Sequence, residues 1–326
     1  MSVLRRLALG FPLSWSHRRN WSLKSLAQPG AEEYFILWDP GDGIYGEEWT
    51  SAPRDRQGVL LSEAQHYYHP IRIAQYALHR HGVFCRTSDP HARSDFIAQA
   101  EWFRDYQSGE IEGSYPFEFP WNKYDAGTGW CSAMAQGQAI SVLLRAASLE
   151  PEHGFYEAAV RAAMPFLVDV SHGGVVWEDR DDLFLEEVGN RHAPHVLNGC
   201  IFALWGLWEL WKRSGEGWIG VMVERTSRTL LRWLDRYDTG WWTLYSLMRS
   251  STNRPHLATL KYHAFHVAQM HVLSVMFGEP AFGEAASRWD LYALRGDCRA
   301  RLIGSTLGSL PERALRLDTV AGGAST

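Results

Sequence analysis

The chain has 326 residues, a hydrophobic fraction of 46%, a charged fraction of 21% and a formal net charge of −5. This composition is typical of a soluble globular protein of one or two domains. The negative net charge gives no electrostatic argument for nucleic acid as a partner, although a local Arg and His cluster could still bind a polyanion. The sixteen Trp residues exceed ordinary usage, which core packing and sugar-stacking clefts could each explain.

The four cysteines are far apart and show neither a CxxC pair nor a zinc spacing, so we expect reduced thiols rather than two disulfides. No apolar run reaches the roughly 20 residues that span a bilayer. The start of the chain resembles a signal peptide only weakly, because Pro12 and Ser14 interrupt its apolar run. The cytoplasm is therefore the expected compartment.

Residues 1–60 are predicted to form an arm followed by irregular or β structure. Tyr34–Trp38 has the composition of a short strand, and the Pro, Gly and Asp residues after it indicate turns. The acidic residues there lack an EF-hand spacing, so we interpret them as solvated loop charges rather than a metal site.

Apolar residues at spacings near 3.6 predict helices along most of residues 61–310, the expected main domain. One helix begins near Pro70, which suits a first helical turn. The others are predicted at about 88–107, 132–149, 153–170, 196–213, 218–237, 262–277 and 281–291. A short hairpin is predicted within 173–184, and residues 311–326 are expected to form a flexible tail.

Residues 113–130 form a long aromatic loop that includes Tyr124 and Trp130. Loops this long are usually functional or disordered. The aromatic composition favours an ordered loop that faces a ligand, and the alternative is a loop that caps the core.

Two carboxylates, Glu186 and Glu187, precede a loop with Arg191 and His192 and then a strongly apolar helix. Acidic, basic and imidazole groups at the mouth of a buried helix are typical of a polar pocket held by a rigid core. An ordinary helical hairpin with a charged turn is the alternative interpretation.

A loose internal repeat organises the helices. Gln75, Gln136, Asn198 and Gln269 each lie near the start of an apolar helix, at intervals of roughly sixty to seventy residues. Repeated helical hairpins bury their apolar faces by stacking on their neighbours. The sequence therefore predicts a mainly α fold in which hairpins close into an (α/α) toroid, with a short irregular or β segment before it.

Five motifs occur in one order and with similar spacing to those of a known family. They are YHPIRIAQYAL at 68–78, GWCSAMAQGQAISVLLRA at 129–146, EE-x11-LNG at 186–199, YDTG-x4-Y at 237–245 and YHxxHxxQ at 262–269. Together they cover about residues 65–292 and resemble the C-terminal domain of heparosan glucuronyl C5-epimerases.

This resemblance implies an incomplete (α/α) toroid and inversion of C5 of D-glucuronate within a polymer, without a cofactor. The partner would be an acidic polysaccharide, and a homodimer is left open. Such chemistry needs a base, an acid, and groups that hold the carboxylate as it becomes enediolate-like.

The resemblance assigns catalytic roles to Glu187, Tyr245 and Tyr262. The alternative interpretation of Glu187 is a surface acid. Without the resemblance, the two tyrosines would be interpreted as core residues with satisfied hydroxyls. Arg249 lies one residue beyond the position of a family arginine that meets the substrate carboxylate. The other expected substrate-binding residues are Arg191, His192, His263, His266, Asn198, Tyr124, Trp130, Gln136 and Tyr68. His263 and His266 could also form a metal pair, but no third ligand is evident, so no metal is expected.

Val188 departs from the animal enzymes, which have a tyrosine after the catalytic Glu. Valine cannot transfer a proton, so Tyr262, Tyr245 or a His must supply the second acid, or the reaction uses one base. A one-base reaction at this carbon is the β-elimination of a polysaccharide lyase. A glycoside hydrolase and a non-catalytic glycan-binding protein are further alternatives.

Overall fold

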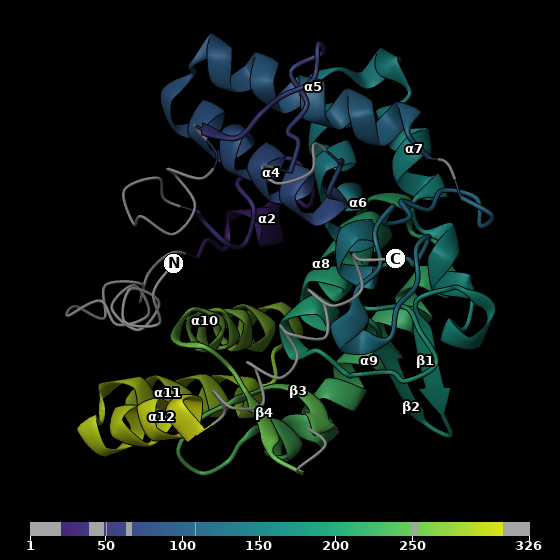
Figure 1. The fold of residues 1–326 in the computed structure, drawn as a ribbon. Helices are drawn as coiled ribbons and strands as arrows, with labels where there is room; N and C mark the ends of the chain where they lie inside the picture. Colours follow the sequence, from purple (N-terminus) through teal and green to yellow (C-terminus); the bar gives the residue numbers. More distant parts are fainter. Residues whose placement is uncertain are drawn as a thin grey trace, which may run out of the picture.

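A computed structural model describes residues 21–38, 49, 51–62, 67–107, 109–249 and 253–308. The protein is mainly helical (Figure 1). Its helices are α2 (Lys24–Ala27), α4 (Pro70–Thr87), α5 (Pro90–Asp105), α6 (Ala133–Leu149), α7 (Phe155–Arg161), α8 (Leu197–Ser214), α9 (Gly217–Trp233), α10 (Leu260–Phe277), α11 (Pro280–Leu294) and α12 (Gly296–Gly308). Short 3₁₀ segments include η3 (Asn122–Tyr124) and η7 (Leu234–Tyr237).

Two antiparallel hairpins interrupt the helices. In the first, β1 (Val176–Asp179) pairs with β2 (Asp182–Leu185), as the sequence predicts. In the second, β3 (Leu244–Arg249) pairs with β4 (Pro255–Leu257) through an irregular register.

The predicted helices are confirmed except for the one at 153–170. There α7 ends at Arg161, and two 3₁₀ turns follow, because Pro165 cannot donate to a continuing helical ladder. The predicted strand at Tyr34–Trp38 is also wrong, since only an isolated bridge joins Trp21 to Ile36. The predicted arm at 1–20 and tail at 311–326 lie outside the described residues.

The helices form consecutive hairpins: α4 packs on α5, α6 on α7, α8 on α9, and α10 on α11. The first helices of these hairpins also contact one another in the order α4, α6, α8, α10. Figure 1 shows α6 and α8 between the α4–α5 pair and the α10–α11 pair.

Small residues bring α6 and α8 into close contact at the centre of the molecule. A Cβ added to Gly137 would lie 2.5 Å from the Cα of Ala203, and one on Gly206 would lie 2.0 Å from the carbonyl oxygen of Gly137. Glycine is therefore needed where these two helices cross, which explains its place in two strongly apolar helices.

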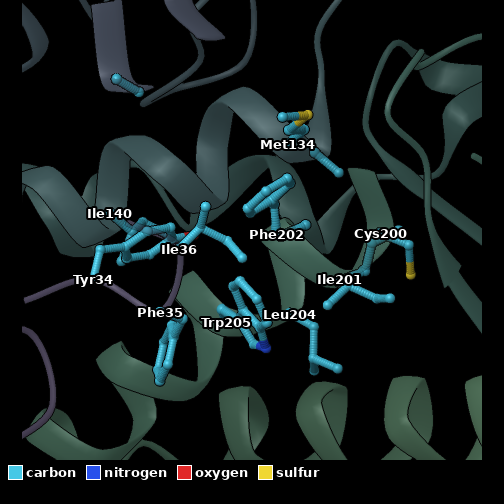
Figure 2. Close-up of a cluster of buried hydrophobic side chains, with 14 of the residues drawn as sticks. Tyr34, Phe35, Ile36, Met134, Ile140, Cys200, Ile201, Phe202, Leu204 and Trp205 are labelled. Carbon is cyan, nitrogen blue, oxygen red and sulfur yellow. The ribbon is translucent and has the colours of Figure 1, made fainter. Parts of the chain in front are cut away.

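The N-terminal segment packs on the same core. Figure 2 shows Tyr34, Phe35 and Ile36 against α6 and α8, and the Phe35 ring centroid lies 4.8 Å from that of Trp205. Arg145 of α6 and Glu209 of α8 form an ion pair at 2.8 Å with both side chains fully buried.

Most of the described tryptophans are buried, and all of the buried ones except Trp130 belong to this core. The buried ones are Trp38, Trp49, Trp102, Trp130, Trp205, Trp208, Trp233, Trp242 and Trp289. Cys85, Cys131, Cys200 and Cys298 are all unpaired, which confirms the expected reduced thiols. No helix in the described ranges combines the length and apolar character needed to cross a membrane.

Candidate active site around Glu187

Backbone hydrogen bonds fix the segment that carries the paired carboxylates. Strand β2 ends at Leu185, and the next residue, Glu186, donates its N–H to Val175 (2.8 Å) and accepts from the N–H of Ala133 (2.9 Å). Gly189 then donates to the carbonyl of Cys131 (2.9 Å). The carboxylates are therefore held against the first turn of α6.

The Glu187 side chain is buried between a tyrosine and a helix. Its exposed fraction is 4%, and the Tyr245 hydroxyl of β3 donates to Oε1 at 3.0 Å. Oε2 has no hydrogen-bond partner among the described residues. A Cβ on Gly199, in the first turn of α8, would lie 2.4 Å from Oε2 and 2.5 Å from the Glu187 Cβ. The glycine of the LNG motif thus makes room for Glu187.

Burial raises the pKa of the Glu187 carboxyl to about 7. The Tyr245 hydrogen bond and the positive charge of Lys123 lower this pKa, and the neighbouring Glu186 raises it. Desolvation is the largest of these effects because it disfavours the charged form. The carboxyl can therefore exchange a proton near neutral pH, as a general base requires.

Glu186 points to a different set of groups. Its Oε2 accepts from the backbone N–H of His195 (3.0 Å), and its Oε1 lies 2.5 Å from Nδ1 of the same residue. The His195 ring lies edge-on to Trp177, Phe184 and Trp233. Glu186 therefore orders the loop before α8, while Glu187 keeps one oxygen that has no hydrogen-bond partner in the described part of the chain.

Three tyrosines surround Glu187. The Tyr245 and Tyr262 ring centroids lie 4.7 Å apart, and Tyr262 comes from the first turn of α10. Burial and the charge of Glu187 raise the pKa of Tyr262 to about 12. The same two causes raise the pKa values of Tyr124 and Tyr245. All three phenols thus keep their protons at neutral pH and can act as donors.

Tyr124 reaches the site from the aromatic loop, which is ordered, as its composition predicts. Gln136 accepts from the N–H of Tyr115 (2.9 Å) and donates to the carbonyl of Gly113 (3.0 Å), so it anchors the start of the loop. Trp130 stacks on Phe117 with centroids 3.9 Å apart and anchors the end. Gln136 and Trp130 therefore position the loop from within the core.

The sequence interpretation missed two residues, Lys123 and His256. The Nζ of Lys123 lies 5.0 Å from the Tyr124 ring centroid, 5.7 Å from that of Tyr245 and 3.0 Å from Nε2 of His256. The sequence does distinguish Lys123, because only four of the 32 Lys and Arg residues are lysines and Lys123 lies inside the aromatic loop.

His263 and His266 are placed in the core instead of at an open surface. Both are fully buried, and their Nδ1 atoms lie 2.8 and 3.0 Å from Oγ1 of Thr243. Nε2 of His263 donates to the carbonyl of Trp289 at 2.9 Å. Burial lowers the pKa of His263 to about 4, so both rings stay neutral and brace α10.

The other predicted binding residues are scattered. Asn198 is buried at the start of α8, and the Tyr68 hydroxyl donates to Asp55 (2.8 Å). Arg191, His192 and Arg249 are exposed on loops and a hairpin end. No group of three or more His, Cys, Asp and Glu side chains within the described ranges could hold a metal ion.

The geometry supports one kind of chemistry best. A carboxylate that titrates near pH 7 can remove a proton from carbon, and adjacent phenols can return one or stabilise an oxyanion. A lysine ammonium beside them can neutralise charge that develops on a carboxylate. These are the groups that proton transfer next to a carboxylate requires.

Comparison with known proteins agrees with this chemistry. The family model described as "D-glucuronyl C5-epimerase C-terminus" matches residues 104–291, which include Lys123, Glu187, Tyr245 and Tyr262. A D-glucuronyl C5-epimerase of Caenorhabditis elegans is 30% identical over 213 residues, 61% of this chain and 35% of the relative. An uncharacterized protein of Methanocaldococcus jannaschii is 24% identical over 179 residues, 54% of this chain and 56% of that protein. The chain thus spans about a third of the first relative and about half of the second.

Proposed function

The chain belongs to the D-glucuronyl C5-epimerase C-terminus family, and from that premise we propose that it inverts C5 of D-glucuronate residues in a heparosan-like polysaccharide. The observation that carries this proposal is the state of Glu187. It is a buried carboxyl with a pKa near 7, one oxygen held by Tyr245 and the other without a partner in the described part of the chain.

In the proposed reaction, Glu187 takes the C5 proton, which is acidified by the adjacent carboxylate. The electron pair left on C5 moves into that carboxylate and gives an enediolate-like intermediate. Tyr262 then returns a proton to the opposite face, and L-iduronate results. Burial of the site strengthens each of these electrostatic interactions.

Val188 is the observation that favours a second candidate function. It is fully buried beside Tyr124 and carries no transferable proton. If no group protonates the second face, the intermediate can instead expel its C4 substituent, which is the outcome of a lyase. The two reactions are separated by incubation with heparosan, since a lyase shortens the chain and leaves an ultraviolet-absorbing unsaturated end. An epimerase keeps the chain length.

We also propose that the four hairpins form the open arc of an incomplete (α/α) toroid. The contacts in the order α4, α6, α8, α10 support this arrangement, because they place the first helices of the hairpins in one row. The N-terminal end of α8 lies at Glu187 and that of α10 carries Tyr262, so the active site would occupy one mouth of the arc.

Tyr262→Phe is expected to separate C5 hydrogen exchange from inversion at C5, two activities that the wild-type protein couples. Glu187 remains, so C5 hydrogen should still exchange with solvent from the D-glucuronate face. Inversion should fall further than exchange, because the donor on the other face is lost. Product ratios read by NMR in deuterated water measure both.

The matched variant is Tyr124→Phe, which removes another phenol near Glu187, one whose hydroxyl has no hydrogen-bond partner in the described residues. It should keep inversion and exchange coupled. If Tyr124→Phe uncouples them and Tyr262→Phe does not, Tyr124 is the acid and the assignment to Tyr262 is wrong.

Gly199→Ala is expected to lower turnover by about ten- to hundredfold, because a small displacement of a catalytic group has effects of this size. The new Cβ would clash with the Glu187 side chain and push it from its position. The control is Gly217→Ala at the start of α9, where a Cβ meets nothing within 4 Å. Turnover of both variants should be measured with thermal unfolding, and wild-type turnover in Gly199→Ala would contradict the proposed position of the base.

A further inference from the structure

Lys123 brings a positive charge to the Glu187 site. Its ammonium lies over the Tyr245 ring, 5.7 Å from the centroid, and the hydroxyl of the same tyrosine donates to Glu187. The charge of Lys123 also lowers the pKa of Glu187, against the larger opposite effect of burial. A sugar ring placed over Glu187 would therefore lie within reach of both groups.

His256 holds this ammonium in place. A lysine ammonium can only donate, so Nε2 of His256 is the acceptor of the 3.0 Å bond. The ring proton is then on Nδ1, which donates to Oγ of Ser246 at 2.7 Å. The His256 ring also lies edge-on to Tyr245 with centroids 4.9 Å apart. The loop lysine is thus fixed to the β3–β4 hairpin through a neutral imidazole.

Three basic residues that the sequence suggested for substrate binding, Arg249 among them for the carboxylate, have other surroundings. Arg249 is exposed at the end of β3 and donates to the carbonyl of Asn253 (3.1 Å). Arg191 is exposed on the loop before α8, and His263 is buried in the core. Among these groups, Lys123 is the one whose charge acts on Glu187.

We propose that Lys123, supported by His256 and Ser246, binds the C5 carboxylate of the substrate uronate and makes the site selective for uronates over neutral hexoses. This inference rests on the proposed function for its reaction step, while its binding step can be tested separately. An ammonium has three N–H donors, so a bond to His256 is compatible with one to a substrate carboxylate.

The same contact would assist the proton transfer. When Glu187 takes the C5 proton, the electron pair enters the carboxylate and increases its negative charge. Lys123 stabilises that charge without giving up a proton, and the pair returns to C5 when Tyr262 protonates it. An interaction that strengthens as charge develops accelerates the step as well as binding the substrate.

The binding test compares a heparosan oligosaccharide with its carboxyl-reduced form, in which glucose replaces glucuronate. Calorimetry should show that the wild-type protein binds the uronate form about ten- to hundredfold more tightly, the range for a hydrogen bond to a charged group. Lys123→Met should lose this preference, and Lys123→Arg should keep part of it.

The matched control is Lys212→Met. Lys212 also lies over an aromatic ring, that of Trp211, with Nζ 4.2 Å from the centroid, but it is thirteen residues beyond Gly199 on α8, about 20 Å away. This variant should keep the wild-type preference. A Lys123→Met protein that still prefers the uronate form to the wild-type extent would overturn the proposal.

A pH profile gives a second measurement that a purely structural role would not move. Lys123 lowers the pKa of Glu187, so removal of its charge should shift the acid limb of kcat/KM for C5 exchange to higher pH. An unshifted limb in Lys123→Met would place the ammonium away from the reacting groups. If the wild-type protein shows no exchange but loses its uronate preference in Lys123→Met, the carboxylate site stands and the epimerase proposal fails.

Discussion

Glu187→Gln is expected to lower turnover by about a hundred- to ten-thousandfold, the range for loss of a general base. The amide oxygen can still accept from Tyr245, so oligosaccharide binding should persist. The fold should persist too. The pKa of Glu187 is higher in the folded protein than its ordinary value, so ionisation of the carboxyl opposes folding as pH rises toward 7. The amide removes that cost, and the melting temperature should be unchanged or higher.

The neighbouring carboxylate provides the comparison for this variant. Glu186 contacts His195 rather than the tyrosines, so Glu186→Gln should have a much milder effect on turnover. C5 exchange reports the abstraction step directly and separates a base from a residue that only binds. Wild-type exchange in Glu187→Gln would show that another group, a His or a Tyr, is the base.

Arg145→Met is expected to cost about 3–5 kcal/mol of unfolding free energy, because it leaves the buried Glu209 carboxylate without its cation. Arg145 lies between α6 and α8 and donates to both Glu209 oxygens, at 2.8 and 3.0 Å. It also donates to the carbonyl of Glu32 (2.9 Å) and to the Ser25 hydroxyl (3.0 Å), so it ties the N-terminal segment to the central helices.

Chemical denaturation measures this cost, and the chain offers an exposed ion pair as the control. Arg228 and Glu224 are one helical turn apart on α9, with side chains 64% and 59% exposed. Exposed pairs contribute little, so Arg228→Met should change the unfolding free energy by less than about 1 kcal/mol. Equal effects of Arg145→Met and Arg228→Met would mean that the buried pair does not hold the core together.

The sequence predicts the helices well where apolar periodicity is strong. Pro70 and Pro90 mark two helix starts, and α6 and α8 begin within a residue of their predicted positions. Prediction from the sequence fails where the pairing of a strand depends on a distant or irregular partner. Strand β3 pairs with only the three residues of β4, and the pairing has register shifts. No alternating pattern of side chains therefore predicts this strand.

The α12 helix was also missed, for a different reason. Residues 296–308 carry glycines at both ends and few apolar side chains, so periodicity does not distinguish this helix from a loop. Helix α12 is stabilised by its packing on α11.

The candidate site was predictable in part. The motifs indicate Glu187, Tyr245 and Tyr262, and the structure brings these three side chains together. They do not distinguish residues that face the site from residues that brace it. Tyr262 and His263 are neighbours on α10, yet one lies beside Glu187 and the other lies in the core. Apolar and polar side chains are not segregated to separate faces of helix α10, so spacing alone could not assign its faces.

The place of Lys123 in the site could not be predicted from the sequence motifs. It reaches Glu187 from a loop more than sixty residues earlier in the chain, and its partner His256 follows on the β3–β4 hairpin. Such a contact depends on the aromatic loop folding back through Gln136 and Trp130, which sequence spacing does not encode.

The most direct test of the account is incubation of the wild-type protein with heparosan in deuterated water, read by NMR. We expect deuterium to enter C5 of the uronate residues and iduronate signals to appear while the chain length stays constant. A heparosan chain that keeps its C5 protons, or that gains unsaturated ends in place of iduronate, would contradict the proposed epimerase.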